Sequence, residues 1–144
     1  MKIAIVFGKG LDGCGVEKFG YEWKRYLPDE VDIYDLQERG FTRSGGHIKD
    51  STSFKAEDIP EVAERLNNDY DIVMLNSYPS PLHKQTTVRS FFEDLVLKIE
   101  KPILVGLMHE IKRMNFDRIP MHIPIANACD MIFNFSTSTT YAED

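Results

Sequence analysis

Five short segments with the apolar pattern of strands are separated along this chain by segments of a different periodicity. Residues 3–7 form a continuous apolar run that ends in glycines, which is typical of a strand buried on both faces of a parallel sheet. Comparable runs occupy residues 70–75, 102–108 and 130–135, and residues 31–36 alternate between apolar and polar side chains, which also indicates a strand. We therefore predict five strands.

The segments between these runs favour helices. Apolar residues recur at helical spacing at Val16, Phe19, Trp23 and Leu27, and Pro28 ends this predicted helix. Residues 58–61 carry aspartate, proline and glutamate at positions that favour a helix start. Further helices are predicted over residues 87–99 and up to residues 125–129. Residues 37–53 are predicted to form a long loop, because they carry three glycines and no apolar period.

Strands that alternate with helices indicate an α/β protein with a Rossmann-like parallel sheet and helices on both faces. Its 144 residues suffice for one domain, so we expect a single domain over residues 1–144. Ligands of such sheets bind at the carboxyl ends of the strands, near the switch in strand order. Four segments expected there are rich in glycine, histidine or basic residues: 8–15, 39–47, 76–80 and 109–118.

Composition and charge exclude several classes of protein. With 42% hydrophobic residues the chain can fill a core, but no apolar run approaches the roughly 18 residues that span a bilayer. The first residues also lack the features of a signal peptide, so we expect no membrane partner. Cys14 and Cys129 give no disulfide framework, which favours a reducing compartment. A net charge of −6 argues against a general DNA coat and leaves room for local basic patches.

A glycine-rich segment lies between the first predicted strand and the first predicted helix. Gly8, Gly10 and Gly13 satisfy the pattern G-x-G-x-x-G, and Asp35 stands about 20 residues later, where a ribose-binding acid would lie. Glycines let the backbone approach a ligand closely, and the N–H groups of a helix start favour an anion. The segment is not a P-loop, since Cys14 stands in place of the lysine. The alternative is a glycine-rich turn that only reverses the chain.

His109 and Glu110 follow directly after the fourth predicted strand. A histidine can exchange a proton with a hydroxyl near neutral pH, and an adjacent carboxylate can orient it or stabilise its cation. These two residues are our candidates for catalysis, with an exposed polar pair at a strand end as the alternative. His83, His122 and the two cysteines have no ligand-like spacing, so we predict no metal site.

Two loops expected at the same edge of the sheet are basic. The positively charged or titratable residues of these loops are Arg39, Arg43, His47 and Lys49, and then Lys112, Arg113 and Arg118. A locally positive rim would attract phosphates, although charged loops are more often only solvated.

Residues 10–19 (GLDGCGVEKF) resemble the first loop and helix of the T-even bacteriophage DNA α-glucosyltransferases. The likeness continues in order through FTRS at 41–44 with His47, DIV at 71–73 with Asn76, Ser77 and Pro79, His109, and ACDMIF at 128–133. It spans nearly the whole chain. The resemblance implies the amino-terminal, acceptor-side half of a two-domain GT-B fold, with the carboxy-terminal donor domain absent.

The activity implied by this resemblance is transfer of a sugar from a UDP-sugar to 5-hydroxymethylcytosine in double-stranded DNA, with retention of configuration. UDP-glucose, or another UDP-sugar, would be the donor substrate, and no tightly bound cofactor is implied. GT-B enzymes bind most of the nucleotide sugar in their second domain. We therefore expect that a second chain or domain supplies the donor site and that residues 1–144 alone are not active. The implied location is the cytoplasm of an infected bacterial host.

Residue roles follow from the same resemblance. The residues implied in donor binding are Gly13, Gly15 and Lys18. The residues implied in binding DNA and the acceptor are Arg43, His47, Asn76, Ser77, Lys112 and Arg113. His109 and Glu110 would contact the acceptor hydroxymethyl group or the sugar. The family's pattern His-Asp-His reads His109-Glu110-Ile111 here, so the acid is kept in type and the second histidine is lost.

Two other functions remain open on the sequence. A stand-alone Rossmann nucleotide-binding domain is supported by the glycine pattern and Asp35. A non-catalytic interaction module derived from a glycosyltransferase would keep the fold without the reaction.

Overall fold

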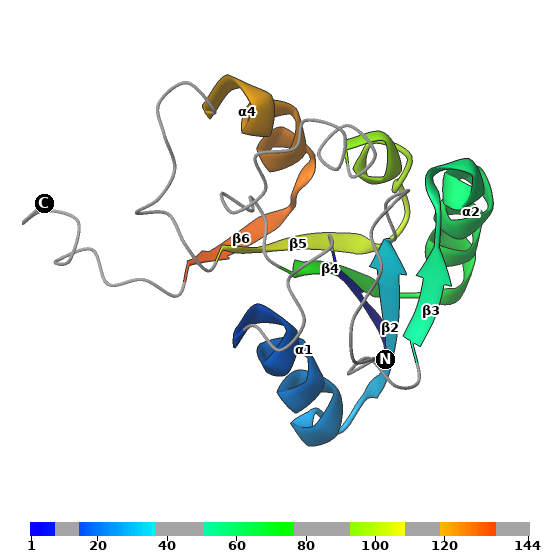
Figure 1. Ribbon diagram of the computed structural model, residues 1–144, viewed down its shortest axis with the longest axis vertical. Coiled ribbons are helices and arrows are strands. Elements are labelled where there is room, and N and C mark those ends of the chain that lie inside the picture. The colour runs from blue at the N-terminus through cyan, green and yellow to red at the C-terminus, as the bar shows by residue number, and fades with distance from the viewer. Residues whose placement is uncertain (8–14, 37–50, 77–92, 109–118, 135–144) are drawn as a thin grey trace, which may run out of the picture.

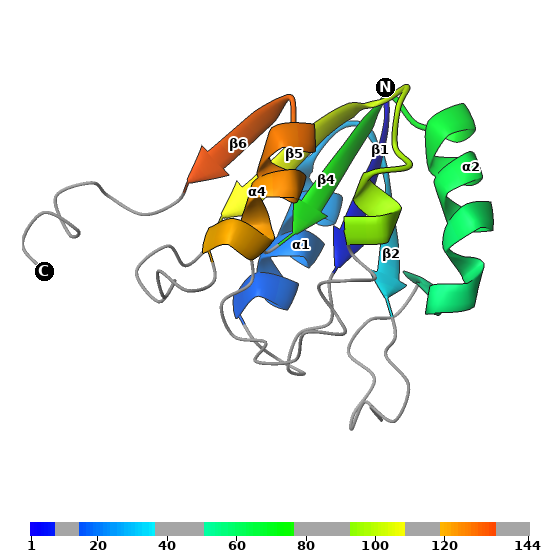
Figure 2. The same ribbon diagram turned by 90° about the horizontal axis from the view of Figure 1, so that it is seen from above.

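The computed structural model shows six parallel strands in one sheet with helices on both faces (Figures 1 and 2). It describes residues 1–7, 15–36, 51–76, 93–108 and 119–134. The strands of these ranges are β1 (Lys2–Phe7), β2 (Glu30–Leu36), β3 (Ser51–Phe54), β4 (Ile72–Asn76), β5 (Ile103–Met108) and β6 (Met131–Asn134). The helices named in Figure 1 are α1 (Gly15–Tyr26), α2 (Ile59–Asp69) and α4 (Ile119–Ala128), and a short 3₁₀ turn, η1 (Ala56–Asp58), precedes α2.

The strand order is β3-β2-β1-β4-β5-β6, and each neighbouring pair is parallel. The chain begins in the centre of the sheet, builds one half outward to β3, and then crosses back beside β1 to build the other half. The strand order therefore reverses between β1 and β4. This arrangement confirms the predicted Rossmann-like sheet, the kind of sheet that forms one half of a GT-B fold.

Alternate residues of each strand point to opposite faces, and each face has its own core. On the face covered by α1, buried strand residues pack against Tyr21, Trp23 and Leu27. Those strand residues include Ile3, Ile5, Ile33, Met74 and Leu107. The helical period predicted for this segment is thus confirmed, with the side chains of Trp23 and Leu27 facing the sheet.

The opposite face carries the larger core and is covered by α2, α4 and the helical turn at 93–96 (Figure 2). Its strand residues include Ala4, Val6, Tyr34, Val73 and Leu75. Its helix residues include Val62, Ala63 and Leu66 of α2, Leu95 and Val96 of the turn, and Ile125 of α4. With helices on both faces, the strands read as the continuous apolar runs seen in the sequence.

Strand β3 corrects the loop predicted for residues 37–53. Its residues Ser51 to Phe54 pair in parallel with Ile33 to Leu36 of β2. The polar sequence Ser-Thr-Ser hid this strand, because an edge strand needs few apolar side chains. Phe54 alone fixes it in the core, where its ring meets Tyr34 edge-on with 6.4 Å between centroids. Residues 37–50 lie outside the described ranges.

The helix predicted to run to Ile99 ends earlier, and Asn67 explains its end. In the described part of this segment, helix covers residues 93–96 and a turn follows. The Asn67 side chain, from α2, donates to the Lys98 carbonyl oxygen at 2.9 Å and accepts the N–H groups of Glu100 at 2.7 Å and Lys101 at 3.1 Å. The Asn67 side chain thus occupies backbone N–H and C=O groups that would form the hydrogen bonds of a longer helix. The first part of the predicted helix, 87–92, lies outside the described ranges.

The predicted start of α2 is confirmed, with Asp58 at the cap position and proline in the first turn. The Asp58 carboxylate, however, accepts the backbone N–H of Lys55 at 3.0 Å and makes no side-chain cap bond to α2.

We expect Leu66→Ala to lower the free energy of unfolding by about 2–5 kcal/mol, because Leu66 is fully buried between α2 and the sheet and truncation leaves a cavity. Leu97→Ala is the matched control. Its side chain is 56% exposed, so a change below about 0.5 kcal/mol is expected. Urea unfolding followed by circular dichroism measures both. Equal losses in the two variants would contradict this packing.

Candidate functional site at the carboxyl ends of the strands

One row of residues crosses the whole sheet near the carboxyl ends of its strands. Strand register places Phe7 of β1 between Asp35 of β2 and Asn76 of β4. The row continues to Ser53 of β3 on one side, and to Leu107 of β5 and Phe133 of β6 on the other. Because registered residues of parallel strands share a face, these positions lie on the α1 face of the sheet.

Asp35 and Asn76 are the two fully buried polar residues in the part of the chain that the structure describes. Both are 0% exposed, and both have interaction partners. They lie two strands apart, roughly 10 Å at the usual strand spacing. A buried carboxyl or amide costs stability unless it is hydrogen-bonded, which agrees with both residues having partners.

Asn76 was predicted to bind DNA or the acceptor, and it is the member of that set that the structure describes. It is the last residue of β4, next to the point where the strand order reverses. Ligands of open α/β sheets bind at this switch. Its side chain is fully buried on the α1 face of the sheet.

Asp35 was considered in the sequence only as a ribose-binding acid. The structure confirms that it lies near the end of β2, in register with the last residue of β1. Its complete burial could not be predicted from the sequence. The alternation of residues 31–36 predicts a strand, but it does not say how exposed the Asp35 carboxyl group is.

The start of α1 lies at the same edge. β1 ends there, and α1 returns the chain to the other edge, where β2 begins after a short connection. Gly15 is the first residue of α1, so the amino-terminal N–H groups of this helix lie at the edge that carries the candidate site. Lys18 lies in the first turn of α1. The structure thus places Gly15 and Lys18, two of the three predicted donor-binding residues, on a helix that starts at the same edge of the sheet as Asp35 and Asn76.

The other predicted site residues lie outside the described ranges. They are Gly13, Arg43, His47, Ser77, His109, Glu110, Lys112 and Arg113. Their places in the sequence still relate them to the sheet: Ser77 follows β4 directly, and His109 and Glu110 follow β5 directly. Their roles stay predictions.

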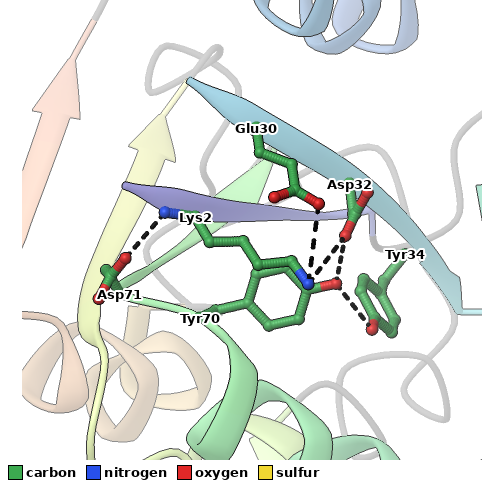
Figure 3. Close-up of polar contacts among 6 residues, drawn as sticks. All are labelled: Lys2, Glu30, Asp32, Tyr34, Tyr70 and Asp71. Carbon is green, nitrogen blue, oxygen red and sulfur yellow. Dashed lines mark hydrogen bonds and ion pairs between the residues drawn. The ribbon is translucent and has the colours of Figure 1, made fainter.

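The opposite edge of the sheet carries a different polar cluster (Figure 3). The Tyr70 hydroxyl donates to the Asp32 carboxylate at 2.6 Å and lies 3.0 Å from the Tyr34 hydroxyl. Because a tyrosine hydroxyl has one proton and Tyr70 gives its own to Asp32, Tyr34 donates to Tyr70. The two rings meet edge-on, with 5.7 Å between their centroids.

Lys2 joins this cluster to β1. Its ammonium lies 3.8 Å from a carboxylate oxygen of Glu30, 4.0 Å from one of Asp32, and 4.9 Å from the centre of the Tyr70 ring. Its backbone N–H donates to the Asp71 carboxylate at 2.8 Å. The cluster connects the amino-terminal ends of β1, β2 and β4, so we assign it to stability of the sheet.

Burial raises the pKa of the Tyr70 hydroxyl well above its ordinary value, and its hydrogen bonds to Asp32 and Tyr34 raise it further. Burial also raises the pKa of the Cys129 thiol to about 11, with Asp130 adding a smaller effect. Cys129 is therefore protonated near neutral pH and is not activated as a nucleophile.

Within the ranges described, no group of three or more histidine, cysteine or acidic residues is placed to hold a metal ion. None of the described helices is long and apolar enough to cross a membrane.

Fold and edge together define a Rossmann-like α/β domain, a class of protein whose ligands bind at the switch in strand order. No protein-family model matches the chain. The chain is similar to the DNA alpha-glucosyltransferase of Enterobacteria phage T4, with 32% identity over 96 residues, which are 63% of this chain and 24% of the phage protein.

Solved alpha-glucosyltransferase structures share the fold of nearly the whole chain. One, in complex with UDP-glucose and DNA containing an abasic site, superposes with a TM-score of 0.71 and 25% identity over 94% of this chain. Another, with UDP and a 13-mer DNA containing an HMU base, gives a TM-score of 0.68 and 27% identity over 93% of this chain. The chain spans 36% and 37% of the lengths of these two chains. The resemblance stated from the sequence motifs is therefore confirmed.

We expect Tyr70→Phe to lower the free energy of unfolding at neutral pH by about 1–3 kcal/mol, because Asp32 and Tyr34 each lose a partner. The raised pKa of Tyr70 means that the folded protein holds this proton more tightly than the unfolded chain. The stability it contributes is fully present below pH about 10, its value in the unfolded chain, and is lost as the pH rises further.

Urea unfolding between pH 7 and pH 11 tests this dependence. The difference between the wild-type chain and Tyr70→Phe should shrink above pH about 10. Tyr26→Phe is the control, since the Tyr26 side chain is exposed, and it should follow the wild-type curve. A difference that stays constant over this range would contradict the assignment.

Proposed function

We propose that this chain forms the acceptor- and DNA-side half of a glycosyltransferase that transfers a sugar from a UDP-sugar to 5-hydroxymethylcytosine in DNA, with retention of configuration. The observation that carries the proposal is the likeness to an alpha-glucosyltransferase in complex with UDP-glucose and DNA, over 94% of this chain. The phage T4 protein with 32% identity supports the same class of reaction and DNA as the partner.

The acceptor would enter at the β1–β4 switch. A base inside a duplex cannot reach an enzyme group, so it must first be extruded into a pocket. Asn76 is the last residue of β4 there, and Ser77 follows it in the sequence. We assign both residues to the acceptor side of the site. Because its side chain is fully buried, Asn76 would act by holding the end of β4 in place beneath the acceptor.

His109 and Glu110 are the proposed catalytic residues. They follow β5, which pairs with β4 next to Asn76, so the chain reaches them close to the proposed acceptor. His109 would take the proton of the acceptor hydroxymethyl group, with Glu110 orienting the imidazole. In a retaining reaction the departing phosphate can itself accept this proton, and His109 would then only position the acceptor.

The donor would meet this half at the start of α1. The N–H groups at the start of a helix favour an anion, which would suit the diphosphate of UDP-glucose. Gly13 and Gly15 would let the backbone approach the donor, and Lys18, in the first turn, would add a positive charge. A further domain or a second chain would hold the rest of the nucleotide sugar.

Contacts to DNA phosphates are assigned to Arg43, His47, Lys112 and Arg113. They follow β2 and β5, so both groups belong to segments that leave the same edge of the sheet. This positive rim would bind a duplex despite the net charge of −6. We place the reaction in the cytoplasm of an infected bacterial host, where such DNA would be found.

A stand-alone dinucleotide-binding domain has less support. The strand order and the position of Asp35 fit it. The Asp35 carboxylate, however, is 0% exposed, and a ribose-binding acid must reach its ligand. An NAD⁺ complex of the enzyme WbmH shares only the fold, at 13% identity and a TM-score of 0.53.

The first experiment compares matched duplexes with and without 5-hydroxymethylcytosine, titrated with the purified chain in low salt. We expect tighter binding of the modified duplex and a loss of affinity with added salt. Arg43→Ala should weaken binding of both duplexes by a similar factor, roughly 3- to 10-fold. It should also reduce the slope of log affinity against log salt concentration by about 1, as expected for the loss of one phosphate contact.

Arg25→Ala is the matched control, because Arg25 lies in the last turn of α1, at the opposite edge of the sheet. It should leave both affinities unchanged. Equal affinity for the two duplexes, or an equal effect of Arg25→Ala and Arg43→Ala, would count against the proposed acceptor site.

A further inference from the structure

The last described part of the chain is unusually poor in charge. Residues 119–134, which form α4 and β6, contain one charged residue, Asp130, in a chain that is 28% charged. The Asp130 carboxylate accepts the backbone N–H of Leu104 at 2.8 Å, so its charge is used within the sheet. Depletion of charge on an exposed surface is typical of the centre of an interface.

The same region exposes large apolar side chains. Met131, Ile132 and Phe133 of β6, Ile123 of α4 and Ile103 of β5 are each between 39% and 53% exposed. Met131 and Phe133 are in register with Val105 and Leu107, so they lie on the α1 face, where Ile103 continues the row. Ile132 lies on the other face. We call these five residues the β6 patch.

β6 is also the edge of the sheet, and in the described ranges it pairs only with β5. Edge strands are normally protected by charged side chains or proline. Neither occurs in Met131–Asn134, and the patch is apolar on both faces. The outer backbone groups of β6 are thus suited to pair with another strand.

We propose that β6 binds the β6 strand of a second copy of this chain, antiparallel about a two-fold axis, so that the two sheets become continuous. Ile132 would face its own counterpart, and Met131 would face the counterpart of Phe133. The pairing would bring the apolar residues of both copies together on both faces of the joined sheet.

The chemistry of the patch favours a second copy as the occupant. A strand that pairs here must itself be apolar on both faces, and β6 meets this requirement. The other edge strand, β3, carries Ser51, Thr52 and Ser53 and does not. Pairing of β6 about a two-fold axis also stops at a dimer, because each sheet has one apolar edge strand among the described strands.

The available area sets the strength of this dimer. With about 200 Å² for each large side chain, the β6 patch offers roughly 450 Å² per copy, or about 900 Å² for two. This is close to the ~1,000 Å² of a specific interface, before the paired strand edges are added. A weak, concentration-dependent dimer is therefore expected. It would leave the carboxyl-end edge of both sheets free.

Sedimentation velocity of the full chain from about 1 to about 200 μM tests the proposal. The wild-type chain should shift from monomer to dimer over this range. Ile132→Lys should remain a monomer, because the pairing would bury two like charges face to face. Leu97→Lys, a change of the same kind at an exposed position outside the patch, should dimerise like the wild type.

A wild-type chain that stays monomeric throughout overturns the proposal, and so does a dimer that survives in Ile132→Lys. Ile132→Cys, in a chain with Cys14→Ser and Cys129→Ser, tests the register without adding a charge. Mild oxidation should link two copies through residue 132, since directly opposed Cβ atoms lie about 4.5–5.5 Å apart. Absence of this link at about 200 μM likewise counts against the antiparallel pairing.

Discussion

The structure depends on β1, which is hydrogen-bonded on both sides and buried on both faces. Residues Ile3 to Val6 are at most 3% exposed, and β1 pairs with β2 and with β4. A strand in this position has no contact with water, so its backbone groups must all be paired with its neighbours. That requirement fixes the strand order around it. It also places the switch in strand order, and with it the candidate site, beside the end of β1.

The two edges of the sheet use polar residues differently. At the amino-terminal edge, Tyr70 is paired within a closed cluster that joins β1, β2 and β4, and the cluster accounts for its own donors and acceptors. At the carboxyl-end edge, Asp35 and Asn76 are buried where the chain leaves the sheet toward the predicted site residues. The first arrangement stabilises the sheet. The second lies at the edge that carries the candidate site.

Much of the fold could be predicted because buried parallel strands read as continuous apolar runs. The exceptions have local reasons. β3 is short and polar, and only Phe54 marks it. The helix before residue 99 ends where Asn67, distant in sequence, binds its backbone, and periodicity cannot show such a partner. For the candidate site, the motifs predicted Asn76 and the start of α1. The burial of Asp35 and its alignment with Asn76 depend on strand register, which a single sequence does not give.

Hydrogen–deuterium exchange with a duplex containing 5-hydroxymethylcytosine tests the central claim, that this chain binds modified DNA at the carboxyl-end edge of its sheet. The account predicts new protection in the segments that leave this edge, residues 8–14, 37–50, 77–92 and 109–118. It predicts none around the Lys2–Tyr70 cluster at the opposite edge. Protection centred on that cluster, or on the outer face of α2, would contradict it.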